Sequence, residues 1–352
     1  MKKVLFIDFL CPKGHIGFNN IYIDALESNK EISLDLAFSK SYFKNLEYNN
    51  INKCITIPDN LFKTSKGIFQ SFLNRIYRYT IQKYIIRNIH LQTYDFVLVS
   101  SFETLTIPLT KFPKNTFFIC HINIELASKN HIFLIALRKI AKQYKLIVFN
   151  KEIKSFLNSK NIFNCDIIPH GLRVPFKISQ IKKDVFSYQE KIMFLPSYTS
   201  SDKDLINDLL SLDKFNEILK KNNIRLILRN HKLKSQKSNI TIYKKYLSTE
   251  EYQGLFLRSD YIFLPYSFKF KHRISAILYE AISNNKKLIV RDISAFKEVR
   301  ENITGAIFFN DFDDLYRKLK NSLLNDIELD YSKFKKLNSP QEIVNRLFDI
   351  KY

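Results

Sequence analysis

The stretch DYIFLPYSFKFKHRISAILYEAISNNKKLIVRD (260–292) holds two short apolar segments with a longer segment of helical periodicity between them. The apolar segments, 260–265 and 287–292, have the length and composition of buried strands, and 273–284 has the spacing of a helix. Two strands joined by a helical crossover run parallel to each other. The stretch therefore predicts a parallel sheet covered by helices.

The same alternation extends along the whole chain. In the first half the expected strands are 4–10, 32–38, 54–58, 95–101, 116–122, 145–150 and 165–170, and the expected helices are 18–29, 67–92, 125–143 and 151–159. In the second half further strands are expected at 191–196, 224–229, 239–243 and 306–310, and further helices at 202–221, 249–257, 294–301 and 311–325. This pattern is typical of an α/β chain with two doubly wound parallel sheets.

A polar, lysine-rich segment at 173–191 lies between the two series of strands. The chain has 352 residues and a domain holds about 150, so two domains are expected. We place the N-terminal domain at 1–172 and the C-terminal domain at 173–338.

The end of the chain carries the signals of a helix start. Ser339 stands at an N-cap position, Pro340 follows it, and Glu342 comes three residues after the serine. We expect a helix within 339–352 that packs back on the N-terminal domain.

The chain is strongly basic. Its 56 Lys and Arg residues outnumber 34 Asp and Glu residues, which gives a formal net charge of +22. Such a charge fits an acidic partner: nucleic acid, an anionic membrane surface or a phosphorylated substrate. The basic residues are spread through the chain, and no helix-turn-helix, zinc-knuckle or RRM-type aromatic signature accompanies them. Specific nucleic-acid binding is therefore an alternative and not the main expectation.

Cysteine use and hydropathy indicate a reducing cytoplasmic setting. No C-x-x-C pair occurs among the four cysteines, Cys11, Cys54, Cys120 and Cys165. The apolar runs are too short to cross a bilayer. The segment MKKVLFIDFL (1–10) contains Asp8 and is followed by no small-residue cleavage site, so we expect a buried strand and not a signal peptide.

The segment 67–92 places Arg, Lys, Tyr and Ile at helical spacing. A surface helix with one face on the core explains this pattern, and so does a helix that docks on a membrane. Both interpretations stay open at this point.

Residues that directly follow strands are the first candidates for a site, because ligands of open α/β sheets bind at the carboxyl ends of the strands. Gly14 and Gly17, after the first strand, would let backbone N–H groups approach an anion at the start of a helix. A tight turn explains the same two glycines.

His121 follows another strand, with Asn123 and Glu125 close behind. A histidine at that place can move protons or hold a sugar hydroxyl, and it can equally be a structural residue of the loop. Ser101 and Glu103 end the neighbouring strand in the same way, and we place them with Asn123 and Glu125 on the acceptor side of a crevice.

The loop RNHKLK (229–234) gathers cations after a strand of the second half. Arg229, His231 and Lys232 could stabilise a pyrophosphate leaving group, as could Lys203 at the head of a helix. In so basic a chain, a solvated loop is the competing interpretation.

The most informative site candidate is the helix within 260–292. Ser275 and Ala276 at its start offer unobstructed N–H groups to a diphosphate. Glu280 can accept both hydroxyls of a ribose.

Taken together, these residues resemble GT-B glycosyltransferases, specifically the family-four (group 1) retaining enzymes. IIPHGL (167–172) is similar to that family's strand end before the interdomain linker, and SAILYEAISNNKKLIVRD (275–292) is similar to its donor-binding helix and strand. By this match Glu280 is the second acid of the E-x7-E motif, and His272 stands in place of the first.

The resemblance implies two Rossmann-like domains facing a cleft. It implies transfer of a sugar from a UDP- or GDP-linked donor to a saccharide or lipid-linked acceptor, in cell-surface polysaccharide or glycolipid synthesis, with retention and without a metal or other cofactor. His121 corresponds to a histidine between donor and acceptor, and with Lys203 and Arg229 forms the expected catalytic set. Gly14, Gly17, Arg229, His231, Lys232, His272, Ser275, Ala276 and Glu280 form the expected donor site.

A lipid-linked acceptor would place the enzyme at an anionic inner-membrane surface by peripheral contact through 67–92. No metal-binding D-x-D follows a strand, and Asp311-Phe312-Asp313 reads as a helix cap.

Three other functions stay open. ILRNHK (227–232) is similar to a loop of transferases that use cytidine nucleotides to move polyol phosphates or sialic acid. The basic charge and the many aromatic residues fit a nucleic-acid-binding protein. His272 in place of a glutamate fits a catalytically degenerate partner subunit.

Overall fold

The computed structural model describes residues 1–10, 15–44, 50–65, 69–177, 190–196, 202–229, 237–322 and 328–350. The chain divides into two compact units. The first unit comprises Met1–Gly171, His272–Ile274 and Asn338–Tyr352, and the second unit comprises Leu172–Lys271 and Ser275–Leu337.

The first unit is built on a parallel sheet of seven strands in the order β3-β2-β1-β4-β5-β6-β7. Its strands are β1 (Lys2–Asp8), β2 (Ile32–Ser39), β3 (Lys53–Ile57), β4 (Phe96–Ser101), β5 (Thr116–Ile119), β6 (Lys145–Val148) and β7 (Cys165–Ile167). Its helices are α1 (Ile16–Glu27), α2 (Lys40–Phe43), α3 (Gln70–Asn88), α4 (Ile122–Lys129), α5 (His131–Gln143), α6 (Lys151–Ser159) and α14 (Pro340–Phe348).

Each face of this sheet buries its own apolar core. Leu5 and Ile7 of β1 belong to the core that includes residues of α3 and α5. Val4 and Phe6 point to the opposite face, where α1 and α14 pack. Side chains alternate along a strand, so a strand covered on both faces reads as one continuous apolar run. This is why the strands of the chain can be predicted from short apolar segments of the sequence.

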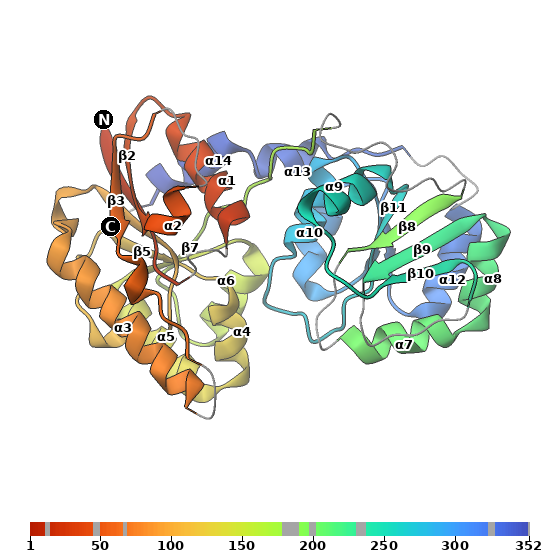
Figure 1. The fold of residues 1–352 in the computed structure, drawn as a ribbon, viewed down its shortest axis with the longest axis horizontal. Coiled ribbons are helices and arrows are strands. Elements are labelled where there is room, and N and C mark those ends of the chain that lie inside the picture. The colour runs from red at the N-terminus through yellow and green to blue at the C-terminus, as the bar shows by residue number, and fades with distance from the viewer. Residues whose placement is uncertain are drawn as a thin grey trace. The chain divides into compact units, whose positions relative to one another are not determined.

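The C-terminal helix α14 lies beside α1 (Figure 1). Ser339 caps it by accepting a hydrogen bond from the N–H of Glu342 at 3.2 Å, and Pro340 occupies the first turn. Ile343, Val344 and Leu347 of α14 are buried in the same core as α1. Burial of this apolar face holds the end of the chain on the first unit.

The segment 125–143, expected as one helix, lies in two. The break falls at Asn130, whose backbone is extended and whose Oδ1 accepts a hydrogen bond from the N–H of Ile132 at 2.9 Å. An asparagine is a strong N-cap, so α5 starts afresh after α4 ends. The segment 202–221 is likewise divided, at Leu212.

The second unit is built on a parallel sheet of six strands in the order β10-β9-β8-β11-β12-β13. Its strands are β8 (Lys191–Leu195), β9 (Ile224–Arg229), β10 (Ile240–Tyr243), β11 (Tyr261–Leu264), β12 (Lys287–Arg291) and β13 (Ile307–Phe309). Its helices are α7 (Lys203–Ser211), α8 (Asp213–Lys221), α9 (Thr249–Arg258), α10 (Ala276–Ser283), α11 (Lys297–Asn302), α12 (Phe312–Ser322) and α13 (Ser332–Leu337). The predicted α/β class with two doubly wound parallel sheets is confirmed.

Within the ranges that the structure describes, no helix combines the length and the apolar composition needed to span a bilayer.

Gly171 ends the first continuous segment of the first unit with a φ of +79°, where an L side chain is strained. A Cβ there would overlap Ile21 of α1 and come within 2.8 Å of Ile343 of α14. We expect Gly171→Ala to lower the free energy of unfolding by about 3 kcal/mol, measured by urea denaturation. Asn161→Gly, which places glycine at another positive φ, is the control and should leave the free energy of unfolding unchanged. An unchanged urea midpoint for Gly171→Ala would contradict this packing.

Candidate functional site

Polar side chains gather at the carboxyl ends of neighbouring strands in the first unit. Asp8, the last residue of β1, is buried and accepts hydrogen bonds from Ser101 Oγ at 2.6 Å and from Asn19 Nδ2 at 2.8 Å. Ser101 ends β4, the neighbour of β1. The hydroxyl of this predicted acceptor-side residue therefore donates to a buried carboxylate of its own unit.

His121 lies just after β5, at the N-cap of α4, and is half-buried. Its Nε2 lies 2.9 Å from the carbonyl oxygen of Ser100. A carbonyl only accepts, so Nε2 carries the proton and Nδ1 of the neutral ring is the acceptor. The ring contacts Phe18 edge-on at 4.5 Å between centroids and Phe149 at 5.1 Å.

Two further histidines join this cluster, and the sequence analysis did not select them as site residues. His170 follows β7, and its ring lies 5.0 Å from Phe18 and 5.1 Å from Phe149. His15 directly precedes α1 and meets the ring of His121 edge-on at 4.8 Å. His170, like His121, stands a few residues after a strand, and that shared position was the signal in the sequence.

The environment of His121 opposes its protonation. Burial is the largest cause that lowers its pKa well below the ordinary value, and the neighbouring His15 and His170 lower the pKa further. The hydrogen bond with Ser100 acts in the opposite direction but does not outweigh them. His121 is therefore a neutral imidazole at physiological pH and a weak base.

A cavity of about 180 Å³ opens beside His121 within the first unit. Its walls are Cys120, His121, Ile122, Phe149, Ile153, His170, Arg273 and Ile274. Small-molecule sites commonly enclose about 300–1,000 Å³, so this cavity holds a fragment of a ligand and not a whole nucleotide sugar.

The other predicted acceptor-side residues have partners within the first unit. Asn123 donates from Nδ2 to the carbonyl oxygen of Phe102 at 3.0 Å and to Thr104 Oγ1 at 2.9 Å, which fixes the start of α4. Glu103 accepts from the N–H of Thr106 at 2.8 Å.

Glu125 forms ion pairs with Lys129 and with Arg273. Arg273 is also one of the residues that line the cavity, so its ion pair with Glu125 helps to hold that lining residue in place. The sequence analysis did not select Arg273, although it adjoins His272.

His272 was expected at the donor site, in the place of the family's first glutamate. In the structure it belongs to the first unit, and its ring stacks on Phe156 with centroids 4.0 Å apart. Gly17 lies in the first turn of α1, and Gly14 lies outside the described residues.

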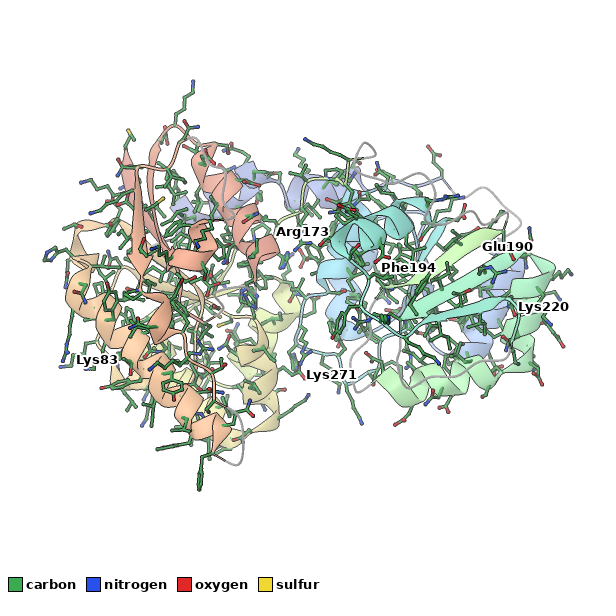
Figure 2. The ribbon with its side chains drawn as sticks, in the orientation of Figure 1. Lys83, Arg173, Glu190, Phe194, Lys220 and Lys271 are labelled. Carbon is green, nitrogen blue, oxygen red and sulfur yellow. The ribbon has the colours of Figure 1, made fainter. Side chains whose placement is uncertain are left out.

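In the second unit, Glu280 is buried on α10 between two hydrogen-bond donors. Arg173 Nη1 lies 2.9 Å from Oε1 of Glu280, and the hydroxyl of Tyr252 donates to Oε2 at 2.6 Å (Arg173 is labelled in Figure 2). Burial and the charge of Glu280 raise the pKa of Tyr252 far above its ordinary value, so the phenol keeps its proton. The carboxylate is thus held in one orientation, and its remaining lone pairs define where further donors can bind.

The start of α10 is arranged by Ser275. Its Oγ accepts from the N–H of Leu278 at 3.2 Å and lies 2.9 Å from the hydroxyl of Tyr266, whose pKa is raised to about 12 by burial. Ala276 is exposed at the first position of the helix. The N–H groups of Ala276 and Ile277 have no acceptor inside a helix at these positions, so they can face an anion.

The basic candidates of the second unit are described only in part. Arg229 ends β9, and its guanidinium lies 3.7 Å from the centre of the exposed Tyr246 ring. Lys203 begins α7, but its side chain lies outside the described part of the chain, as do His231 and Lys232 entirely.

The described residues contain no group of three or more His, Cys, Asp or Glu side chains placed to hold a metal ion. Asp311, of the D-x-D considered above, accepts from the N–H of Asp314 at 2.8 Å at the start of α12.

Neither a protein-family model nor a curated protein sequence matches the chain. Solved structures match it over its whole length at low sequence identity. Anabaena HepE in complex with UDP and glucose has a TM-score of 0.66 at 13% identity, over 99% of this chain and 100% of that one. The trehalose-6-phosphate synthase OtsA has a TM-score of 0.61 at 10% identity, over 100% of both chains. UDP-GlcNAc 2-epimerase from Methanocaldococcus jannaschii has a TM-score of 0.60 at 16% identity, over 99% of both.

These matches show that the chain has the GT-B fold. The resemblance to GT-B glycosyltransferases is confirmed at the level of the fold, and the assignment to the family-four type stays a prediction.

The lowered pKa of His121 makes stability depend on pH. This histidine becomes protonated near pH 6.5 in the unfolded chain but stays neutral in the folded protein. Its contribution to the free energy of unfolding is therefore complete above pH 6.5 and is lost as the pH falls below that value. Over the pH unit below 6.5, we expect the free energy of unfolding to fall by up to about 1.4 kcal/mol more in the wild type than in His121→Gln.

Urea denaturation at several pH values measures this difference. His90→Gln, at an exposed position of the same unit, is the control and should keep the wild-type pH dependence. If His121→Gln also keeps it, the imidazole is not held neutral.

Proposed function

We propose that the protein transfers a sugar from a nucleoside-diphosphate sugar to a saccharide or lipid-linked acceptor, as a glycosyltransferase of the GT-B fold. The observation that carries the proposal is Glu280, a buried carboxylate fixed by Arg173 and Tyr252 on a helix whose N-terminus faces outward at Ala276. A carboxylate that accepts hydrogen bonds from ribose hydroxyls, next to N–H groups that donate to a diphosphate, can hold the ribose and the diphosphate of a nucleotide.

Of the donor classes expected from the sequence, uridine has the most support. The titles of two matching structures name UDP with HepE and a UDP-forming trehalose-phosphate synthase from Burkholderia xenovorans. These names describe those proteins, at 13% and 12% identity. We therefore propose a UDP-sugar donor, with a GDP-sugar as the next candidate.

The first unit is proposed to bind the acceptor beside His121. A neutral imidazole with a low pKa is a poor general base, so we assign His121 to positioning: Nδ1 can accept a hydrogen bond from the acceptor hydroxyl. In a front-face displacement, the bond from the anomeric carbon to the diphosphate breaks as the bond to the acceptor oxygen forms. The hydroxyl proton then passes to the departing diphosphate. Retention and independence of metal are parts of this proposal.

Cations would offset the charge that develops on the diphosphate. The guanidinium carbon of Arg229 lies 3.7 Å from the centre of the Tyr246 ring, and we propose that its N–H groups donate to the diphosphate. Lys203, His231 and Lys232 remain predicted partners of the diphosphate. Where the acceptor is lipid-linked, in polysaccharide or glycolipid synthesis, the reaction takes place at a membrane surface.

The proposal is tested by the thermal midpoint of the protein with UDP, GDP, CDP, ADP or TDP, each with and without Mg²⁺. A ligand that binds only the folded state raises the midpoint. We expect UDP to raise it most and Mg²⁺ to make no difference. A shift with CDP alone would favour the cytidine-nucleotide transferase, and no shift with any nucleotide would contradict a donor site.

A substitution at Glu280 tests whether this carboxylate binds the nucleotide. We expect Glu280→Gln to weaken UDP binding about ten- to a hundredfold, because charge-assisted hydrogen bonds contribute about 1.5–3 kcal/mol. The matched control is Glu190→Gln. Glu190 forms an ion pair in the same unit, with its Oε1 2.6 Å from Nη2 of Arg225 (Glu190 is labelled in Figure 2). Its substitution should leave UDP affinity unchanged. Equal affinities for the wild type and Glu280→Gln, measured by calorimetry, would remove Glu280 from the site.

A further inference from the structure

Two neighbouring helices of the first unit expose large apolar side chains to solvent. On α3 and just before it, Phe69, Phe72 and Ile76 are exposed by 71%, 59% and 42%. On α5, Ile132 and Ile135 are exposed by 64% and 40%. We call these five side chains the apolar patch. Scattered apolar residues are normal on a surface, but five on two adjacent helices need an explanation.

The residues of the apolar patch share the outer faces of their helices. Phe69, Phe72 and Ile76 recur at the spacing of one helical face, and so do Ile132 and Ile135. The opposite faces, with Ile81 and Ile85 on α3 and Leu134 and Leu137 on α5, are buried in one core against the sheet. The patch therefore belongs to surface that the sheet does not cover.

The two helices lie side by side. Arg75 of α3 stands over the ring of Phe133 of α5, 5.9 Å from its centre, so the N-terminal halves of the two helices are neighbours. Both helices connect parallel strands, and both therefore run opposite to the strands. Their N-terminal halves, with the apolar patch, consequently lie toward the end of the sheet where the strands have their carboxyl ends. His121 lies at that same end.

Basic residues continue the same helices, and acidic residues are missing from them. The two helices together carry seven Lys and Arg residues and no Asp or Glu: Arg75, Arg78, Lys83, Arg87, Arg138, Lys139 and Lys142. Arg87, Lys139 and Lys142 are exposed, and Lys83 is labelled on α3 in Figure 2. Protein surfaces that bind anionic membranes typically combine exposed apolar side chains with neighbouring cations.

We propose that the exposed faces of α3 and α5 bind an anionic lipid bilayer, with the apolar patch inserted among the headgroups and with Lys83, Arg87, Lys139 and Lys142 contacting lipid phosphates; Arg75 pairs instead with Glu103, and Arg138 donates to the carbonyl of Lys160. A second copy of this chain would bring like charges together, which opposes pairing through this face. The apolar patch lies toward the end of the first sheet where the strands have their carboxyl ends, which is the end where His121 lies. The proposal stands on this surface alone and does not depend on the proposed reaction.

Vesicle flotation of the full chain, without any donor, tests the proposal. We expect the protein to float with phosphatidylcholine vesicles that contain phosphatidylglycerol and to stay behind with phosphatidylcholine alone. Added salt should weaken the binding, because the electrostatic part is screened. Flotation that needs no anionic lipid, or none with either vesicle, would overturn the proposal.

Paired variants assign the binding to this surface. Phe72→Ser with Ile132→Ser should lower vesicle affinity about tenfold or more, because the buried apolar area is lost. Phe163→Ser is the matched control: Phe163 is exposed by 69% in the same unit, on the loop before β7. An equal loss in the control would show nonspecific adsorption and overturn the assignment.

Charge reversals complete the test. Lys83→Glu with Lys142→Glu should lower vesicle affinity about tenfold or more. Lys220→Glu with Lys221→Glu on α8 makes the same charge change elsewhere and should leave vesicle affinity nearly unchanged. Thermal midpoints check that all variants fold. Light scattering that shows a dimer dissociated by Phe72→Ser, or binding of RNA in preference to vesicles, would assign the surface to another partner.

Discussion

The constraint on which the structure depends is that parallel strands buried on both faces all end at one edge of their sheet. The backbone groups of β1 and β4 are paired along their length, so the chain can leave the sheet only at its ends. Polar residues that follow strands therefore collect at one place. Asp8 ends β1, Ser101 ends β4 and His121 follows β5; Ser101 donates to Asp8, and His121 bonds to the carbonyl of the adjacent Ser100.

The two units use that edge in different ways. In the first, aromatic rings surround His121 and keep it neutral, so its hydrogen-bonding direction is fixed without a charge. In the second, Glu280 is buried beside an arginine and a protonated phenol. A buried charge that is paired on both oxygens is tolerated, whereas an unpaired one is costly. The proposed acceptor site rests on the first of these properties, and the proposed nucleotide site rests on the second.

The sequence predicted the strands well because burial on both faces leaves an unbroken apolar signal, as in KLIVRD (287–292) and β12. Helix ends were harder to predict, because the N-cap at Asn130 divides a segment whose helical periodicity is continuous. Partners of the site residues were the least legible. Arg173 reaches Glu280 across 107 positions, and Arg273 reaches Glu125, through contacts that only the fold creates. His170 carried the same positional signal as His121 and could have been selected.

Hydrogen–deuterium exchange with and without saturating UDP is the direct test of a nucleotide site at Glu280, because it locates the bound nucleotide without any substitution. We expect slower exchange at the first turn of α10, after Ser275, and at 172–176 beside Glu280, with α3 and α5 unchanged. Slower exchange confined to other elements of the chain, or none at saturation, would contradict a nucleotide site built on Glu280.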